Sequence, residues 1–393
     1  MKITKIDIMQ LNQGQPSRRS VILRIYTDEG IYGDGEAALA YGIGSTAAFG
    51  MIQDLAPLII GDDPLAHEVI WNKLYKTTFW GQNGGPVTWA GISAIDIALW
   101  DIKGKFFNQP VYRLLGGKFR DDLRTYASQL QFGWGPEREA VGKTEDLAAV
   151  AKQVVAEGYD AVKIDFFTYD RDGRNFTTEE QTGLLSPYYL DLIEERVAAV
   201  REAVGPGVDI IAENHSKPDA NGAVQIGNRI RKYNIFYFEE PNTPTPKLAK
   251  VIGDRIGIPI AHGERVYSRW QYAPYFENSS VQVIQPDLGN TGGITEAKKI
   301  ADLAYTYDVS VQLHVCHSPL STSAALHFEA AIPNFVIHEY HRASLIKTSQ
   351  ELCIYDPKPV KGRFAIPELP GLGNEWSEKA LTENIKVTVR EKN

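Results

Sequence analysis

The chain has 393 residues, of which 43% are hydrophobic and 23% charged, as is usual for a soluble globular protein. Its net charge of −8 argues against a nucleic acid or an anionic membrane as partner, because either needs a basic surface. The two cysteines, Cys316 and Cys353, are too few for a disulfide scaffold and favour a reducing compartment. Neither a signal peptide nor an apolar run of about 20 residues is evident, so we expect a cytoplasmic protein.

The first 120 or so residues combine β-strands with helices. KITKIDIM and SVILRIYTDEGIYGDGEA are rich in β-forming residues and predict a meander, with a turn at Asp28–Gly30. In AGISAIDIALWDIKGK the apolar residues recur at steps of three and four, which predicts a helix. The glycines of LLGG, at Leu114–Gly117, predict a helix end because glycine readily takes the left-handed capping conformation.

From about residue 123, short apolar strands alternate with amphipathic helical patterns. Eight strands with helical crossovers predict a parallel sheet, and eight is the number that closes a (β/α)8 barrel. Seven helical patterns fit between the strands, and the pattern for an eighth helix is weak. The tail after residue 345 has four prolines and no clear periodicity, which favours a returning segment over a third domain. The predicted strands cover residues 123–130, 161–167, 208–214, 235–241, 258–264, 280–287, 310–316 and 334–340.

Ionisable residues end every predicted strand from the second to the eighth. Barrel enzymes place their chemistry at these carboxyl ends, whereas a barrel that only had to be stable would avoid converging, desolvated charges. In chain order they are Lys163 and Asp165, Glu213 and His215, Glu239 and Glu240, Glu264, Asp287, His314, and Glu339.

Three of these residues, Glu213, Glu239 and Glu264, end consecutive strands at spacings of 26 and 25 residues. Neighbouring strands lie about 5 Å apart, so three carboxylates would crowd one arc of the rim unless a cation neutralised them. Oxygen ligands favour Mg²⁺ over Zn²⁺. The alternative is that each glutamate pairs with a nearby base such as Arg265 or Lys217. Such pairing readily explains a single glutamate at a strand end, but it explains three glutamates in register less well.

Two histidines gain significance from their neighbours. His215 stands two residues after Glu213, so both side chains point the same way along a strand. Asp287 ends the strand before that of His314, and an aspartate bonded to one ring nitrogen would fix the tautomer of a general base. His67 is expected at the surface. The other histidines are interpreted as structural or have no assigned role: His262, His317, His327, His338 and His341.

The segments SAIDIALWDIKGK, FEEP, HGER and QPDLGNTGGITEAKKIADLA together resemble the enolase superfamily, in its mandelate racemase-like branch. The resemblance covers nearly the whole chain. It implies an α+β capping domain over residues 1–122, a barrel over 123–345, and a C-terminal segment over 346–393 that completes the capping domain. Loops near Gln13–Arg19 and Trp80–Gly85 would then close over a small-molecule substrate, and a homo-oligomer is expected.

The resemblance also implies roles for the strand-end residues. Glu213, Glu239 and Glu264 would bind Mg²⁺, and Asp287 with His314 would form a catalytic dyad. Glu339 would be a protonated acid that hydrogen-bonds the substrate carboxylate.

Two departures from the racemase pattern narrow the expected activity. Lys163-Ile164-Asp165 replaces Lys-x-Lys, and Glu213 stands where the first metal ligand is commonly aspartate. Together with His215, these features are similar to sugar-acid dehydratases of the gluconate and galactonate types. The expected reaction is Mg²⁺-dependent: His314 takes the C2 proton of an aldonate, and His215 protonates the departing 3-hydroxyl, leaving a 2-keto-3-deoxy acid.

The remaining assignments stay open. Lys163 is expected to screen or hydrogen-bond the substrate carboxylate, and Asp165 to hold Lys163 or a sugar hydroxyl. His215 or Lys163 could replace His314 as the base. An epimerase or cycloisomerase on the same scaffold, or a non-catalytic sugar-acid binding protein, are the alternative functions, and the sugar acid itself cannot be read from the sequence.

Overall fold

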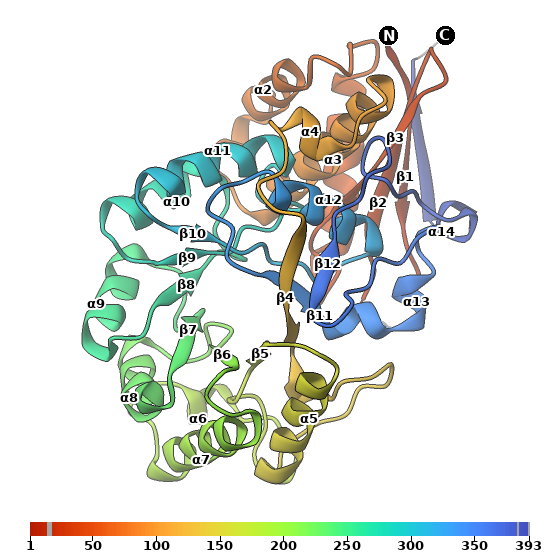
Figure 1. Cartoon of the computed structure of the whole chain (residues 1–393). Coiled ribbons are helices and arrows are strands. Elements are labelled where there is room, and N and C mark those ends of the chain that lie inside the picture. Colours follow the sequence, from red (N-terminus) through yellow and green to blue (C-terminus); the bar gives the residue numbers. More distant parts are fainter. Residues whose placement is uncertain (14–17, 383–384, 392–393) are drawn as a thin grey trace.

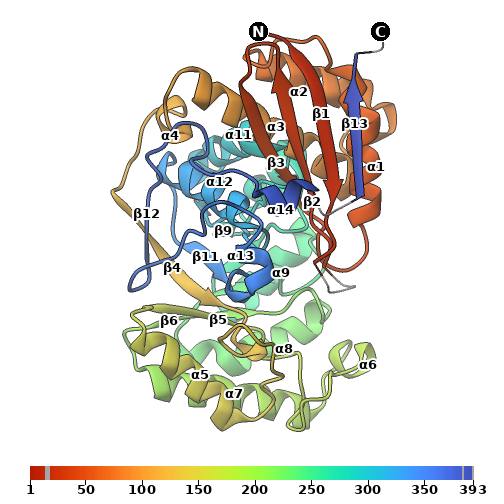
Figure 2. The ribbon, with the colours of Figure 1, turned by 90° about the vertical axis from the view of Figure 1, so that its right-hand side faces the viewer.

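The computed structural model describes residues 1–13, 18–382 and 385–391. A four-stranded antiparallel sheet lies at the upper right in Figure 1, with the strand order β13-β1-β2-β3. Figure 2 shows β13 alongside β1, although the two strands come from opposite ends of the chain. The strands are β1 (Ile3–Gln10), β2 (Val21–Thr27), β3 (Tyr32–Ala37) and β13 (Ile385–Arg390).

Helices α1 (Ser45–Leu55) and α3 (Pro86–Phe106) pack on this sheet, and α2 (His67–Thr77) packs on α3. The close approach of α3 to β3 depends on two glycines. A Cβ atom at Gly33 would lie 2.1 Å from the carbonyl oxygen of Ala98, and one at Gly35 would lie 2.0 Å from that of Ala94. Glycine is therefore the residue that lets helix and strand touch backbone to backbone.

Eight parallel strands form the barrel in the order β10-β9-β8-β7-β6-β5-β4-β11. A parallel bridge between Val311 and Phe335 joins the two ends of this row. The predicted (β/α)8 architecture is confirmed. The strands are β4 (Asp122–Ser128), β5 (Ala161–Ile164), β6 (Asp209–Glu213), β7 (Ile235–Glu239), β8 (Ile260–His262), β9 (Val283–Ile284), β10 (Ser310–Val311) and β11 (His338–His341).

Several of these strands are shorter than predicted. The segment 280–287 contributes only β9, and its backbone cannot continue a regular ladder past Pro286, which has no N–H to donate. The segment 334–340 pairs first with β10 and joins β4 only from His338 onward. Residues 285–287 and 311–313 nevertheless stay buried. The apolar pattern therefore predicted the burial of these segments correctly, but it overestimated the length of their strand pairing.

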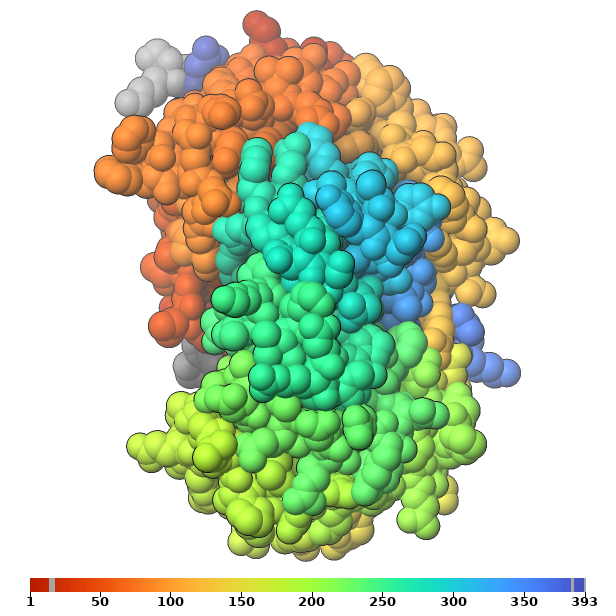
Figure 3. Space-filling view, turned by 90° about the vertical axis from the view of Figure 1, so that its left-hand side faces the viewer, coloured from red at the N-terminus to blue at the C-terminus, as the bar shows by residue number. Residues whose placement is uncertain are grey.

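Seven helices surround the barrel between successive strands, matching the seven predicted. Figure 3 shows the outer surface of several of them, in green to blue, below the orange N-terminal region. They are α5 (Thr144–Ala156), α7 (Pro187–Val204), α8 (Ala220–Ile230), α9 (Pro246–Ile256), α10 (Ser268–Glu277), α11 (Gly293–Thr306) and α12 (Pro319–Ala330). Short elements complete the chain: α4 (Val111–Leu114), α6 (Thr178–Gln181), α13 (Lys347–Gln350), β12 (Arg363–Ala365) and α14 (Glu378–Thr382). The predicted helix end is confirmed, because α4 stops at Leu114 ahead of two glycines with positive φ.

Helix α3 also holds the N-terminal region on the barrel, which explains why it is buried on nearly all sides. Ser93 Oγ accepts from the backbone N–H groups of Gly292 and Gly293, at 2.8 and 3.0 Å. Asp96 Oδ2 accepts from Thr295 N at 2.9 Å. These side chains satisfy N–H groups at the start of α11 that have no partner within that helix.

The C-terminal segment returns to the N-terminal sheet, as predicted. Trp376 donates from its backbone N to Asp34 Oδ2 at 3.0 Å and from its indole to Leu23 O at 3.1 Å. The proposed domain boundaries at residues 122 and 345, and the homo-oligomer, stay predictions. Of the helices in the described ranges, none is both long and apolar enough to cross a membrane. His67 is largely buried rather than at the surface, since its ring packs on Trp100 with centroids 4.6 Å apart.

Candidate active site

A buried lysine lies at the centre of the carboxylates on the barrel rim. Nζ of Lys163, from β5, lies 2.6 Å from Glu239 Oε1, 2.9 Å from Glu339 Oε1 and 3.4 Å from Glu213 Oε2. Burial alone would lower the pKa of Lys163, but the three glutamates outweigh it and hold that pKa well above its ordinary value. Lys163 is therefore a cation, and one positive charge faces three carboxyl groups.

An unpartnered carboxyl oxygen makes this rim suitable for a metal. Glu239 Oε2 is buried and has no hydrogen-bond partner in the described structure. Burial raises the pKa of Glu239 to about 8, although Lys163 opposes the rise. A carboxylate oxygen buried without a partner is costly unless a cation binds it. The residues present therefore fit a hard divalent cation, which prefers oxygen ligands.

The three predicted ligands do not have equivalent contacts. Glu213 and Glu264 come together with His215, with one ligand atom from each residue lying within 4.8 Å of the others. Glu239, on β7, pairs instead with Lys163 of β5, which lies on the other side of the strand of Glu213. Arg265 contacts Glu264, and also Glu240 at 3.0 Å. Of the three predicted metal ligands, Glu264 is therefore the one that pairs with Arg265, as the alternative to metal binding expected.

His215 lies between two carboxylates. Its Nδ1 is 2.7 Å from Asp165 Oδ2, and its Nε2 is 2.9 Å from Glu213 Oε1. Burial would lower the pKa of His215, but these two carboxylates raise it to about 10, which makes the ring a proton donor at neutral pH. Asp165 pairs with His215 and with Lys217 Nζ, at 2.7 Å each, and not with Lys163 as one of the expectations had it.

A second imidazole–carboxylate pair occupies the next part of the rim. His314 Nδ1 lies 2.7 Å from Asp287 Oδ2, and His314 Nε2 lies 3.2 Å from Glu264 Oε2. The predicted dyad residues are thus in contact. Asp287 Oδ2 also bonds His317 Nε2 at 2.8 Å, a contact that the sequence did not reveal because His317 follows the strand end in an irregular segment.

Glu339 is surrounded by donors. Ser128 Oγ donates to its Oε1 at 2.7 Å, and the backbone N–H of Val315 donates to its Oε2 at 2.9 Å. Burial would raise the pKa of Glu339, but Lys163 outweighs it and lowers that pKa well below its usual range. The expected protonated acid is therefore not the form that these neighbours favour.

The two predicted capping loops are partly described. Residues 14–17 of the Gln13–Arg19 loop lie outside the described residues. Arg18 reaches the rim, where its Nη2 donates to the backbone oxygen of Cys316 at 2.7 Å. In the other loop Trp80 is 90% exposed, so it is accessible to other molecules in this conformation.

Comparison with protein-family models decides the relationship of the chain to known proteins. Residues 146–380 match the enolase C-terminal domain-like family, and residues 9–116 match the N-terminal domain of the mandelate racemase / muconate lactonizing enzyme family. The chain belongs to the enolase superfamily. The predicted mandelate racemase-like relationship is therefore confirmed over both halves of this enolase-superfamily protein.

Three relatives illustrate the range of similarity within the enolase superfamily. D-xylonate dehydratase of Haloferax volcanii is 34% identical, with 90% of this chain and 82% of the relative covered. D-galactonate dehydratase of Pectobacterium atrosepticum is 32% identical, with 98% and 95% covered. A crystal structure of a member of the enolase superfamily from Salmonella Typhimurium is 49% identical, with a TM-score of 0.96 and 99% and 100% covered.

Proposed function

We propose that this protein is a Mg²⁺-dependent hydro-lyase that dehydrates a sugar acid, an aldonate such as gluconate, galactonate or xylonate. The observation that carries the proposal is the presence of two imidazoles with separate carboxylate partners on one rim. His215 belongs to Glu213 and Asp165, and His314 to Asp287. Both rings approach Glu264, which supports one of them as the proton donor and the other as the proton acceptor beside the same proposed metal ligand. Dehydration needs one group of each kind.

His314 acts as the base in this proposal. Asp287 accepts the N–H of its Nδ1, so Nε2, which faces Glu264 Oε2 at 3.2 Å, is the nitrogen that would take the C2 proton of the substrate. The same carboxylate stabilises the imidazolium that results. The electron pair of the C2–H bond passes to the carboxylate, and it then forms the C2–C3 double bond as the C3–O bond breaks.

His215 acts as the acid. Its ring lies between Asp165 and Glu213, two carboxylates that favour the protonated form, and it gives a proton to the 3-hydroxyl, which leaves as water. The enol that remains tautomerises to a 2-keto-3-deoxy acid, so the product differs from the substrate by one water molecule. Asp165 and Lys217 hold the ring in place.

Glu213, Glu239 and Glu264 would hold the Mg²⁺. The ion would supply Lewis-acid polarisation of the substrate carboxylate. Lys163 supports the negative charge that develops on that carboxylate, and Glu339 fixes the position of Lys163.

The test is a panel of aldonates, including D-xylonate, D-galactonate and D-gluconate, incubated with the protein and Mg²⁺ in D₂O. We expect a 2-keto-3-deoxy acid from at least one of them, observed by NMR. Retained substrate with deuterium at C2 and no keto acid would reject the dehydratase and favour an epimerase or cycloisomerase. Binding without exchange or turnover across the panel would favour a sugar-acid binding protein.

In the same assay His215→Gln separates the two proton transfers. We expect the variant to lose keto-acid formation while it still exchanges the C2 proton. Loss of both reactions together would place His215 in the first step and reject its role as the acid.

A further inference from the structure

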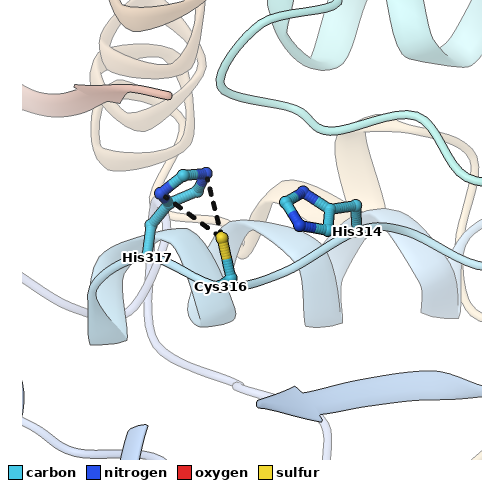
Figure 4. A group of neighbouring side chains, drawn as sticks. All are labelled: His314, Cys316 and His317. Atoms are coloured by element: carbon cyan, nitrogen blue, oxygen red, sulfur yellow. Dashed lines mark hydrogen bonds between the residues drawn. The ribbon is translucent and has the colours of Figure 1, made fainter. Parts of the chain in front are cut away.

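Three potential metal ligands follow β10 in one short segment: His314, Cys316 and His317, the His–Cys–His cluster. Figure 4 shows the thiol of Cys316 between the two rings. One ligand atom from each residue lies within 4.8 Å of the others, and Cys316 Sγ is 3.9 Å from each ring nitrogen of His317. Only small movements would bring such atoms around one ion, because zinc binds nitrogen at about 2.0–2.1 Å and sulfur at about 2.3 Å.

The carboxylate of Asp287 organises both rings of the cluster. It bonds Nδ1 of His314 at 2.7 Å and Nε2 of His317 at 2.8 Å. In the neutral rings these bonds leave the lone pairs that a metal needs on Nε2 of His314, which now faces Glu264 Oε2 at 3.2 Å, and on Nδ1 of His317. A carboxylate behind a histidine is the usual support of a metal-binding imidazole, because it fixes the tautomer and raises basicity. Here one carboxylate supports two rings.

The cluster is also held in position and remains reachable. Arg18 donates to the backbone oxygen of Cys316 at 2.7 Å, and Ser318 is bonded to Glu36, so both ends of the segment are anchored to the N-terminal region. His317 is 5% exposed, whereas Cys316 and His314 are half-buried. An ion would reach the cluster through the exposed parts of these two residues.

The donors differ in kind from those of the proposed Mg²⁺ site. Glu213, Glu239 and Glu264 offer oxygen, whereas the cluster offers one sulfur and two imidazole nitrogens. Thiolate and imidazole ligands select Zn²⁺ and similar soft ions, and carboxylates select Mg²⁺. The two sites adjoin, since His314 Nε2 lies 3.2 Å from Glu264 Oε2.

We propose that the His–Cys–His cluster binds a thiophilic divalent metal, of the Zn²⁺ and Cd²⁺ class, separately from the cation of the three glutamates. The bound metal occupies the lone pair of His314 Nε2. In that state His314 cannot accept a proton, so the site is inhibitory. The binding itself does not depend on the proposed function, whereas the inhibition does.

The first test is a titration of Cd²⁺ into the full-length protein saturated with Mg²⁺. We expect thiolate-to-cadmium ultraviolet absorption that saturates near one Cd²⁺ per chain. Cys316→Ser should abolish this absorption and weaken Cd²⁺ binding by more than about tenfold. The matched control is Cys353→Ser, at the other cysteine, which lies buried in the C-terminal segment and should leave the absorption unchanged. Absorption that survives in Cys316→Ser, or that is absent from the wild type, overturns the proposal.

A second test uses the wild-type protein alone, so it does not depend on how the variants fold. Iodoacetamide labelling is followed by mass spectrometry of the Cys316 peptide, with and without Cd²⁺ in the presence of excess Mg²⁺. We expect Cd²⁺ to slow alkylation of Cys316 by more than about tenfold. Equal rates overturn the proposal.

The inhibitory part is measured on the aldonate that the protein turns over. Zn²⁺ should inhibit at saturating Mg²⁺, and Cys316→Ser should resist that inhibition. Normal Cd²⁺ binding at Cys316 with no inhibition would reject the inhibitory role, but it would still support the proposed metal site. Absence of any turnover would instead bear on the proposed function.

Discussion

The substitution Asp287→Asn tests the proposed base most directly. Asp287 Oδ2 accepts from two imidazoles, at 2.7 and 2.8 Å, and its Oδ1 accepts from Gly289 N at 2.7 Å. An asparagine has one acceptor oxygen and an NH₂ group that can only donate. If that NH₂ group faces His314, the ring must accept at Nδ1 and carry its proton on Nε2, which is the wrong tautomer for a base.

The expected loss follows from these contacts. A hydrogen bond to a charged group is worth about 1.5–3 kcal/mol, which corresponds to roughly 10- to 150-fold in rate. The wrong tautomer adds to this, and the analogous change in a Ser-His-Asp triad costs about 10⁴ in kcat. We therefore expect Asp287→Asn to lower kcat by about 10²- to 10⁴-fold, with a small change in KM.

The assay is steady-state turnover of the best aldonate, with Mg²⁺ affinity measured alongside by calorimetry. Mg²⁺ affinity should stay within about twofold of the wild type, because Asp287 is not among the proposed ligands. A kcat within about threefold of the wild type, in a variant that folds normally, would refute the assignment of His314 and Asp287 as the base.

Three further changes test the metal site, the contact between the two parts of the fold, and the loop after β5. Glu239→Gln should weaken Mg²⁺ binding by more than about tenfold in calorimetry while circular dichroism stays unchanged, because it removes a charged ligand; unaltered affinity would exclude Glu239 from the site. Burial raises the pKa of Asp96 to about 7 in the folded protein, from 3.8, so the folded state holds a proton that the unfolded state has lost between about pH 4 and pH 7. Stability should fall as pH rises through that window, by up to about 1.4 kcal/mol per pH unit, and Asp96→Asn should remove the fall while its amide oxygen still accepts from Thr295; equal pH dependence of urea unfolding in the two proteins would contradict this. The buried guanidinium of Arg196 donates to four backbone oxygens, including those of Phe166 and Asp170. Arg196→Met should therefore lower the free energy of unfolding by at least about 3 kcal/mol. A loss below about 1 kcal/mol would show that those oxygens find other partners.

The barrel and the strand-end residues could be predicted because they depend on a simple rule. Parallel strands point their carboxyl ends to one rim, so the order of strands along the chain also orders the residues around that rim. Glu213 and Glu239 face each other directly in the β6–β7 pairing. Asp287 and His314 are in contact for the same reason, since they follow neighbouring strands.

Contacts made by irregular backbone could not be predicted in this way. His317 lies beyond β10, and its bond to Asp287 depends on the conformation of the segment that follows the strand. Lys163 passes β6 to reach Glu239 on β7, a distance that strand order does not encode. Arg18 meets Cys316 across 298 residues of sequence, from a loop without periodicity.

The pairing of β1 with β13 constrains how the chain can fold as it is synthesised. Lys5 is opposite Arg390, so β1 leaves the ribosome long before β13 can pair with it. Until then β1 is an open edge carrying the apolar side chains of Ile3, Ile6 and Ile8, and such an edge is prone to pairing with other chains. Aggregation of this protein should therefore begin with nascent chains that stall before residue 385.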